Sequence, residues 1–387
     1  MPGTLAKFDP GEGYRLIVAG GGTGGHLFPG VAVAQAFQAR HIHNRVLFVN
    51  AGRPLDVSVL NRLGWQHRTI AIEGIKGRGK WRQAMAAAKI PRAIWQSRGL
   101  LLEFKPQVVM GVGGYSAGPV AVAAWLMGIP MVMHEQNREP GLTNRWVRRI
   151  ANRIYLSFED RGGEFDAHKT LVTGNPVRDE ILTHGGKGRV PHAADTFTVM
   201  ILGGSQGAHA INEAMVAALP HLSAVGGLRV VHQTGRDDEM WVSKAYAEGG
   251  LAATVRAFFD DMAERYAQAD LIICRAGATT VAEITVVGRA ALFIPFPQAA
   301  DDHQTANARA LVDAGAAEMI PQSELTGTVL ADRIAYYRRN PAIIGTMAAK
   351  ALTLGRPEAA LSIVRDIYRL IENKGEGSRQ AVIGKRT

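Results

Sequence analysis

The sequence predicts an α/β protein with two Rossmann-like domains, and three observations lead to this prediction. Short, continuous apolar runs alternate with stretches of helical character. Several of these runs end in glycine-rich turns. The order of strand, glycine turn and helix starts again at residue 197. Continuous apolar strands that alternate with helices are typical of parallel sheets covered on both faces.

The first half of the chain opens this pattern. A strand is expected over residues 15–19, followed by the glycine turn 20–26 and a helix over 31–39. Later strands are expected over residues 46–49, 108–110 and 131–133, and a further glycine-rich turn is expected over residues 111–119. Together these elements predict a first domain over residues 1–176.

The second half repeats the pattern. A strand over residues 197–202 enters the glycine turn 203–208, and a helix over 211–218 follows. Three later strands are expected over residues 229–232, 271–274 and 291–294. These elements predict a second domain over residues 177–355.

The C-terminal segment 356–372 has apolar residues at helical spacing, and we expect it to pack back on the first domain. The polar residues 373–387 predict a flexible tail. Ligands of doubly wound sheets bind outside the carboxyl ends of the strands. Two parallel sheets that face each other across a cleft would therefore bring both sets of glycine turns together.

The charge of the chain is unevenly distributed. The 387 residues carry a net charge of +10. Residues 1–177 hold 22 Lys and Arg against 11 Asp and Glu, whereas residues 178–387 hold 22 against 23. The excess positive charge of the first half predicts an anionic partner: nucleic acid, a phosphate-rich ligand or an anionic membrane.

The residue types exclude several kinds of site. The one cysteine, Cys274, excludes a disulfide scaffold and a cysteine-rich zinc site. The sequence has no Asp-x-Asp pair, which argues against carboxylates that hold a metal at a nucleotide diphosphate. We therefore expect no metal site and no required cofactor, although a divalent cation could stimulate turnover.

Gly20, Gly22 and Gly25 fit the G-x-G-x-x-G pattern of dinucleotide-binding domains. The acidic residue that would hold a ribose is absent, because Asn50 stands at the end of the next strand. A P-loop motif is also absent from the sequence. The glycine turns at 20–26 and 203–208 then have two interpretations, phosphate binding at a helix N-terminus or close packing of strand and helix.

Three further features are candidates for catalysis or substrate binding. His26 lies on the first glycine turn, where an imidazole can act as a general base, contact substrate or be structural. Glu283 follows Thr279 and Thr280 by one helical turn, where it can accept both hydroxyls of a ribose or be a solvated helix residue. The polar loop 301–304 offers groups for sugar hydroxyls.

A basic segment with tryptophans lies in the first half. Residues 74–102 contain seven Lys and Arg and no acid, and they include Trp81 and Trp95. A second basic group surrounds Trp146. This composition fits an anionic membrane surface, a nucleic acid, or an amphipathic core helix with a solvated basic face. We expect the membrane surface, through Trp81, Trp95 and the surrounding Lys and Arg, and no nucleic acid.

Longer motifs carry a resemblance to a known family. They follow one another along most of the chain, over residues 20–30, 113–119, 134–137, 173–178, 203–208, 233–235, 259–262, 275–283 and 295–296. In this order they resemble the MurG family of bacterial cell-wall N-acetylglucosaminyltransferases. The resemblance implies the two-domain GT-B fold.

The resemblance also implies an activity. A member of this family would transfer N-acetylglucosamine from UDP-N-acetylglucosamine to lipid I, which is undecaprenyl-pyrophosphoryl-N-acetylmuramoyl-pentapeptide. The reaction inverts the anomeric carbon and forms lipid II for peptidoglycan synthesis. The protein would lie on the cytoplasmic face of the bacterial inner membrane as a peripheral protein.

The family's site residues can be placed on matching positions of this sequence. His26 is the implied catalytic base, with Glu135 as the second candidate. Ser205 would bind the diphosphate, Phe259 would meet uracil through its backbone, and Glu283 would take the ribose hydroxyls. The other implied contacts of donor and acceptor are Thr23, Gly24, Gly25, Asn137, Arg178, Ala278, Thr279, Thr280, Val281, Ala282 and Gln304.

The sequence also departs from the family pattern. Ala276 stands where the family often has serine, and the loop 297–303 differs from its usual form. Two alternatives to this activity stay open. One is another GT-B enzyme that uses a UDP-sugar, such as a glycolipid transferase or an epimerase, and the other is a non-catalytic basic protein that binds membranes or nucleic acid.

Overall fold

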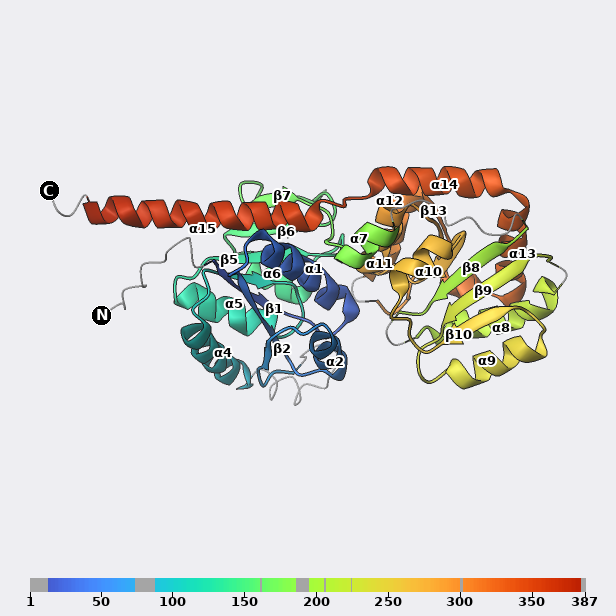
Figure 1. The fold of residues 1–387 in the computed structure, drawn as a ribbon, viewed down its shortest axis with the longest axis horizontal. Helices are drawn as coiled ribbons and strands as arrows, with labels where there is room; N and C mark the ends of the chain where they lie inside the picture. The colour runs from blue at the N-terminus through green and yellow to red at the C-terminus, as the bar shows by residue number, and fades with distance from the viewer. Residues whose placement is uncertain are drawn as a thin grey trace. The chain divides into compact units, whose positions relative to one another are not determined.

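A computed structural model describes residues 13–73, 88–160, 162–185, 195–204, 207–223, 225–299 and 302–383. The chain forms two compact units, each with helices on both sides of a sheet (Figure 1). The first unit comprises Met1–Gln136, Pro140–Pro176 and Glu358–Thr387. The second comprises Asn137–Glu139 and Val177–Pro357.

The described residues of the first unit form a parallel sheet of seven strands, in the order β3-β2-β1-β4-β5-β6-β7. The central strand β1 (Arg15–Ala19) pairs with β2 (Arg45–Asn50) on one side and with β4 (Val108–Gly111) on the other. The strands further out are β3 (His67–Thr69), β5 (Met131–Glu135), β6 (Arg153–Leu156) and β7 (Thr170–Val172). The strand order reverses between β1 and β4, which is where ligands of such sheets bind.

Helices cover both faces of this sheet. Leu16 and Val18 of β1 face a core formed with α1 and α15, whereas Ile17 and Ala19 face a core formed with α4 and α5. This alternation is that of any strand buried on two faces. The helices of the first unit are α1 (Gly24–Arg40), α2 (Pro54–Arg62), α4 (Ile90–Phe104), α5 (Ala117–Leu126), α6 (Leu142–Val147) and α15 (Ala359–Ile383).

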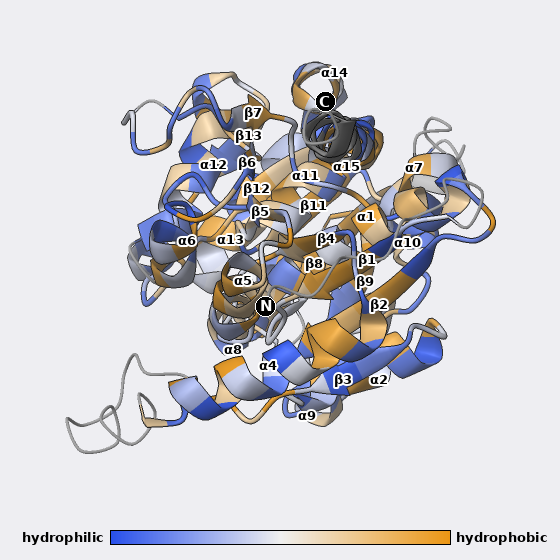
Figure 2. Ribbon diagram, turned by 90° about the vertical axis from the view of Figure 1, so that its left-hand side faces the viewer, coloured by the Kyte–Doolittle hydropathy of each residue, from blue (hydrophilic) through white to orange (hydrophobic). Residues whose placement is uncertain are grey.

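The second unit repeats the plan with six described strands, in the order β10-β9-β8-β11-β12-β13. They are β8 (Phe197–Leu202), β9 (Leu228–Gln233), β10 (Ala253–Arg256), β11 (Leu271–Cys274), β12 (Ala290–Phe293) and β13 (Ala317–Met319). The central strands of both sheets are mainly hydrophobic (Figure 2). The predicted α/β class with two parallel sheets is confirmed.

The helices of the second unit flank its sheet. Ile211 and Met215 of α8 pack on Val199 and Ile201 of β8 within one large core. The helices are α7 (Asp179–Gly185), α8 (His209–Leu222), α9 (Glu239–Glu248), α10 (Met262–Gln268), α11 (Ala278–Val287), α12 (His303–Asp313), the short 3₁₀ helix η3 (Gln322–Glu324), α13 (Gly327–Arg339) and α14 (Pro341–Leu354).

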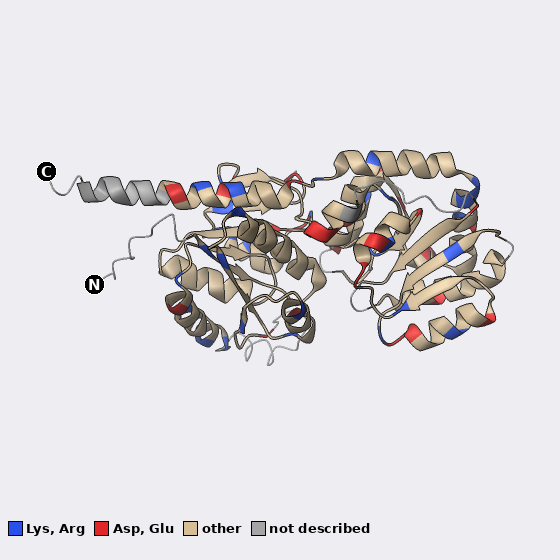
Figure 3. Cartoon of the chain, in the orientation of Figure 1, with Lys and Arg blue, Asp and Glu red and all other residues tan. Residues whose placement is uncertain are grey.

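The C-terminal helix α15 completes the first unit. Ile363, Val364 and Ile367 are fully buried in the core that α1 also lines, and the Tyr155 hydroxyl donates to Asp366 at 2.9 Å. The part of this helix that is coloured in Figure 3 carries charges of both signs. The helix continues to Ile383, beyond the predicted end at residue 372.

The first helix also differs from its prediction, because α1 begins at Gly24 and not at residue 31. Thr23 precedes it in an extended conformation, and its carbonyl accepts from the amides of His26 and Leu27. The helix therefore includes part of the glycine turn. Among the described residues, none of the helices combines the length and the apolar composition that crossing a membrane requires.

Candidate functional site

The first glycine turn holds an internal carboxylate. The amide of Gly22 donates to both oxygens of Asp56, at 3.0 and 2.8 Å. Asp56 is fully buried, and this burial raises the pKa of its carboxyl. Gly21 has a φ of +127°, and a Cβ there would lie 2.7 Å from Asp56 Oδ2, so only glycine fits. The turn is therefore shaped around Asp56, and an anion at the Gly22 amide would have to displace that carboxylate.

His26 lies in the first turn of α1, at the carboxyl end of β1. Its Nδ1 is 3.2 Å from the Thr23 hydroxyl. Its ring packs against Gly113, where an added Cβ would lie 2.7 Å from His26 Cδ2. Gly24 and Gly25 share this turn, so four predicted residues of the first unit, Thr23, Gly24, Gly25 and His26, lie together. An imidazole held in this way by a hydroxyl and a glycine can transfer a proton at the edge of the sheet.

Glu135, the second candidate base, ends β5 and is buried. Its Oε2 accepts from the Asn144 side chain at 2.7 Å and from the Gly141 amide at 3.1 Å. This carboxylate therefore fixes the start of α6. Next to it, His134 is fully buried, and burial lowers its pKa to about 4, so its ring is neutral.

The second glycine turn follows β8, and Gln233 at the end of β9 supports it. The Gln233 side chain donates to the Gly204 carbonyl at 3.1 Å. The same side chain accepts from the Phe259 amide at 3.0 Å. The Phe259 amide, one backbone group of the predicted uracil contact, is thus bonded within the protein. Gln233 joins the glycine turn to the segment that contains Phe259.

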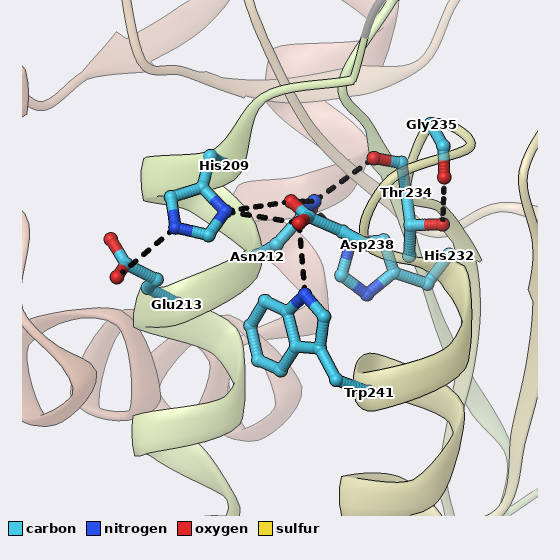
Figure 4. Close-up of polar contacts among 8 residues, drawn as sticks. All are labelled: His209, Asn212, Glu213, His232, Thr234, Gly235, Asp238 and Trp241. Atoms are coloured by element: carbon cyan, nitrogen blue, oxygen red, sulfur yellow. Dashed lines mark hydrogen bonds and ion pairs between the residues drawn. The ribbon is translucent and has the colours of Figure 1, made fainter.

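A polar network, in which Asn212 and Asp238 are buried and His209 is exposed, supports the same turn (Figure 4). The Asp238 carboxylate accepts from Trp241 Nε1 at 2.8 Å, Asn212 Nδ2 at 2.7 Å and His209 Nδ1 at 2.9 Å. Burial alone would raise the pKa of Asp238, but these three donors outweigh burial and lower it. Asn212 also donates to the Thr234 carbonyl at 2.9 Å, against which Gly207 packs.

The amino end of α11 lies at the carboxyl end of β11. Gly277 precedes the helix in an extended conformation, and Ala278 opens it. Ala278, Thr279 and Val281 are buried, so this turn presents mainly backbone. The first amides of a helix have no partner within it and attract anions. The predicted phosphate and nucleoside contacts, Ala278, Thr279, Thr280, Val281 and Ala282, form this first turn and its continuation.

Glu283 lies on the same helix and is buried. Its Oε1 accepts from Arg178 Nη2 at 3.1 Å, and its Oε2 accepts from the Tyr266 hydroxyl at 2.9 Å. Burial alone would lower the pKa of Arg178, but the carboxylates of Glu283 and Glu180 outweigh burial and raise it. The structure therefore brings two of the predicted residues, Glu283 and Arg178, into one buried ion pair.

Asn137 and Gln304 have bonds to other parts of the second unit. The side chain of Asn307, which is fully buried, donates to Asn137 Oδ1 at 3.3 Å and to the Ala276 carbonyl at 3.2 Å. The Gln304 side chain accepts from the Phe296 amide at 2.9 Å. Asn307 thereby anchors the short segment Asn137–Glu139 beside the strand end that precedes α11.

Comparisons with known proteins decide the family. The model of the glycosyltransferase family 28 N-terminal domain matches residues 16–156, and that of the C-terminal domain matches residues 198–363. The chain belongs to glycosyltransferase family 28. Within this family, the predicted resemblance to MurG proteins is confirmed, and the chain is a glycosyltransferase.

Two relatives of this family 28 chain carry the same name, UDP-N-acetylglucosamine--N-acetylmuramyl-(pentapeptide) pyrophosphoryl-undecaprenol N-acetylglucosamine transferase. The protein of Syntrophus aciditrophicus is 49% identical over 92% of this chain and 99% of its own length. The protein of Geobacter sulfurreducens is 45% identical over 91% of this chain and 98% of its own length.

Solved structures agree with the family 28 assignment. The crystal structure of Acinetobacter baumannii MurG is 34% identical, with a TM-score of 0.72 over 92% of this chain and 99% of that one. A UDP-GlcNAc 2-epimerase of Neisseria meningitidis has a TM-score of 0.66 at 13% identity, over 92% and 99% of the two chains. The second likeness shows the fold alone.

Some predicted contacts of this glycosyltransferase lie outside the described residues: Ser205, Trp81 and the basic residues Lys76, Arg78, Lys80 and Arg82. In the part of the chain that the structure describes, no three His, Cys, Asp or Glu side chains are grouped as a metal site.

Among the polar residues of the site that the sequence analysis missed are Asp56, Asn212, Gln233, Asp238, Tyr266 and Asn307. For Gln233 a signal existed, because it opens the Gln233-Thr234-Gly235 motif.

Proposed function

We propose that this family 28 enzyme transfers N-acetylglucosamine from UDP-N-acetylglucosamine to lipid I and so forms lipid II for peptidoglycan synthesis. The observation that carries this function is the 49% identity to the Syntrophus aciditrophicus transferase over almost the whole of both chains. The motifs that carry the resemblance fall at the carboxyl ends of the strands, where sheets of this kind bind ligands.

The donor binds to the second unit. The amides at the start of α11 offer the diphosphate hydrogen bonds and the positive end of the helix dipole. Glu283 accepts the ribose hydroxyls, while Arg178 holds its carboxylate. Phe259 meets uracil through its backbone, and Ser205 assists at the diphosphate. Asn137 and Gln304 contribute polar groups for the sugar.

The acceptor hydroxyl is activated in the first unit. His26 takes the proton of the muramoyl 4-hydroxyl, and the oxygen attacks the anomeric carbon on the face opposite UDP. A new carbon–oxygen bond forms there as the bond to the β-phosphate oxygen breaks. Thr23 orients the imidazole, and Gly24 and Gly25 let the acceptor approach the backbone. His26 is preferred to Glu135 as the base, because two donors already engage the buried Glu135 carboxylate.

The leaving UDP carries the negative charge that develops in the reaction. Backbone amides and the dipole of α11 can stabilise this charge without a bound metal. No cofactor is required in this mechanism, and a divalent cation acts at most as a stimulator.

A membrane surface supplies the lipid substrate. Trp95 of α4 is 73% exposed and Trp146 of α6 is 66% exposed. Arg149 stacks over the Trp146 ring at 5.1 Å. Exposed tryptophans among arginines suit the interface of an anionic bilayer. We place the enzyme on the cytoplasmic face of the inner membrane, bound peripherally.

The experiment that tests this function measures UDP release from UDP-N-acetylglucosamine with and without a lipid I analogue, in the presence of a chelator. Release that depends on the acceptor is the expected result, and it would also show that metal is dispensable. Donor binding without release would favour another acceptor or an epimerase. The absence of any donor binding would refute the proposal.

Binding to vesicles tests the membrane surface. Vesicles that contain phosphatidylglycerol should bind the protein, and those of phosphatidylcholine alone should bind it weakly. Replacing Trp95 and Trp146 with alanine should reduce the binding. Unchanged binding of the double variant would contradict this surface.

A further inference from the structure

Three elements of the second unit meet at the Glu283 carboxylate. Arg178, just before α7, donates to Oε1 at 3.1 Å. Tyr266 of α10 donates to Oε2 at 2.9 Å. Tyr266 and Glu283 are almost fully buried, with 1% and 5% of their surface exposed. The two donors occupy different oxygens, so together they fix the plane of the carboxylate.

The Tyr266 hydroxyl is a permanent donor in this place. Burial and the neighbouring Glu283 carboxylate raise the pKa of this phenol well above its ordinary value, so the hydroxyl keeps its proton. An ionised carboxylate can only accept hydrogen bonds. The direction of the bond, from Tyr266 to Glu283, is therefore settled.

The backbone of Tyr266 is also held in place. Arg289 is buried, and its Nε donates to the Tyr266 carbonyl at 2.8 Å. Its Nη2 donates to the Ala267 carbonyl at 2.9 Å. A guanidinium suits this position, because the last carbonyls of a helix carry partial negative charge. Arg289 thus fixes the end of α10, and with it the Tyr266 ring.

We propose that Tyr266 is a positioning residue for the nucleotide donor, whose hydroxyl orients the Glu283 carboxylate so that its remaining lone pairs accept the ribose hydroxyls. Each carboxylate oxygen has two acceptor sites, so one remains on Oε1 and one on Oε2 after Arg178 and Tyr266 have bonded. This inference rests on the proposed function, because it assumes that Glu283 meets a ribose.

The second unit contains a matched control. Tyr337 of α13 donates to Glu318 Oε2, and Arg333 is bonded to the same oxygen. This trio has the same three residue types and a buried tyrosine, yet it lies on β13 and α13 and includes none of the predicted donor contacts. Tyr337→Phe therefore removes a comparable hydroxyl without touching the donor site.

The test compares Tyr266→Phe and Tyr337→Phe with the unmodified enzyme. KM and kcat are measured for UDP-N-acetylglucosamine and for its 2′,3′-dideoxyuridine analogue (the deoxyribose donor), which lacks both hydroxyls, with a lipid I analogue as acceptor. We expect Tyr266→Phe to raise KM for the ribose donor about tenfold, which corresponds to about 1.4 kcal/mol. The kcat of Tyr266→Phe, and its KM for the deoxyribose donor, should stay within about twofold of the values for the unmodified enzyme. Tyr337→Phe should change neither kcat nor KM for either donor.

Two results would overturn the inference. One is an equal loss for the ribose and deoxyribose donors, because a positioning role at the ribose predicts a loss for ribose alone. The other is an unchanged KM of Tyr266→Phe for the ribose donor. Failure of the proposed function is distinct, since it would show as no turnover of UDP-N-acetylglucosamine by the unmodified enzyme.

A second variant guards against a folding defect in Tyr266→Phe. Arg289→Lys keeps the positive charge at the end of α10 but cannot reproduce both hydrogen bonds of the guanidinium. It should give a smaller rise in KM, again confined to the ribose donor. A rise that is the same for both donors would contradict the role of α10 in positioning Glu283.

Discussion

Substitution of Asn212 should lower the free energy of unfolding more than substitution at most other positions of the second unit. Its side chain is fully buried and makes three hydrogen bonds. It donates to the Thr234 carbonyl at 2.9 Å and to Asp238 at 2.7 Å, and its oxygen accepts from His232 Nε2 at 2.9 Å. His232 is neutral, because burial lowers its pKa to about 3. Its Nε2 therefore carries the proton, and its Nδ1 accepts from the Tyr246 hydroxyl at 3.0 Å.

Asn212→Ala would leave the His232 N–H and the Thr234 carbonyl without this partner. Each buried group that loses its partner costs about 1–3 kcal/mol. Asp238 keeps the hydrogen bonds from Trp241 and His209, so the loss of its bond from Asn212 adds little to the free-energy cost of the substitution. We expect a loss of about 3–5 kcal/mol in the free energy of unfolding. For a domain of roughly 150–250 residues this corresponds to a fall in Tm of about 6–20 °C.

Urea denaturation and calorimetry measure this loss. Glu213→Ala is the control, because Glu213 contacts the other side of His209 at 3.3 Å in an exposed ion pair and should cost less than about 0.5 kcal/mol. Asn212→Asp separates hydrogen bonding from packing. Its size is unchanged, but its carboxylate would face Asp238, so it should cost at least as much as alanine. A cost of Asn212→Ala below about 1 kcal/mol would refute the reasoning.

Three further predictions concern pH and the first unit. Burial lowers the pKa of His134 to about 4 and that of His232 to about 3, below the ordinary value of 6.5. The contribution of each buried, neutral histidine to the stability of its unit is therefore complete above pH 6.5. This stability is lost as the pH falls towards the lowered pKa values. At pH 5 the loss is about 2 kcal/mol for each residue, which urea denaturation at pH 7.5 and pH 5 measures. Equal midpoints at the two pH values would contradict it. His26→Ala should lower kcat by about 10²–10⁴ with little change in donor KM, and near-normal turnover would remove His26 as the base. Asp56→Ala should lower the free energy of unfolding by about 1–3 kcal/mol, because it leaves the Gly22 amide without its acceptor. An unfolding free energy equal to that of the unmodified enzyme would show that water replaces the carboxylate.

The strands and glycine turns were predictable because their signals are local. The run at residues 15–19 and the turn that follows it are contiguous in the sequence, and so are those at 197–208. The start of α1 was missed because Pro29 and Gly30 disfavour a helix, yet both lie buried within it. Here the packing of α1 on the sheet outweighs local preference.

The supporting residues of the site could not be predicted in this way. Asp56 lies 34 residues from Gly22, Gln233 lies 29 from Gly204, and Tyr266 lies 17 from Glu283. No periodicity relates such pairs, because the fold alone brings the ends of different elements together. The motif residues Glu283 and Arg178 could be named beforehand, but not the tyrosine that holds one of them.

The place of α15 in the first unit has a consequence for the order of synthesis. Ile363, Val364 and Ile367 complete a core whose members outside α15 all precede Pro176. Residues 177–357 must be translated between the two parts, which takes roughly 10–40 s at about 5–20 residues per second. During that interval the surface of α1 that α15 covers is exposed on the nascent chain. The unit that starts first is therefore the one that finishes last, and a ribosome that stalls before the final helix would release a protein with an open core.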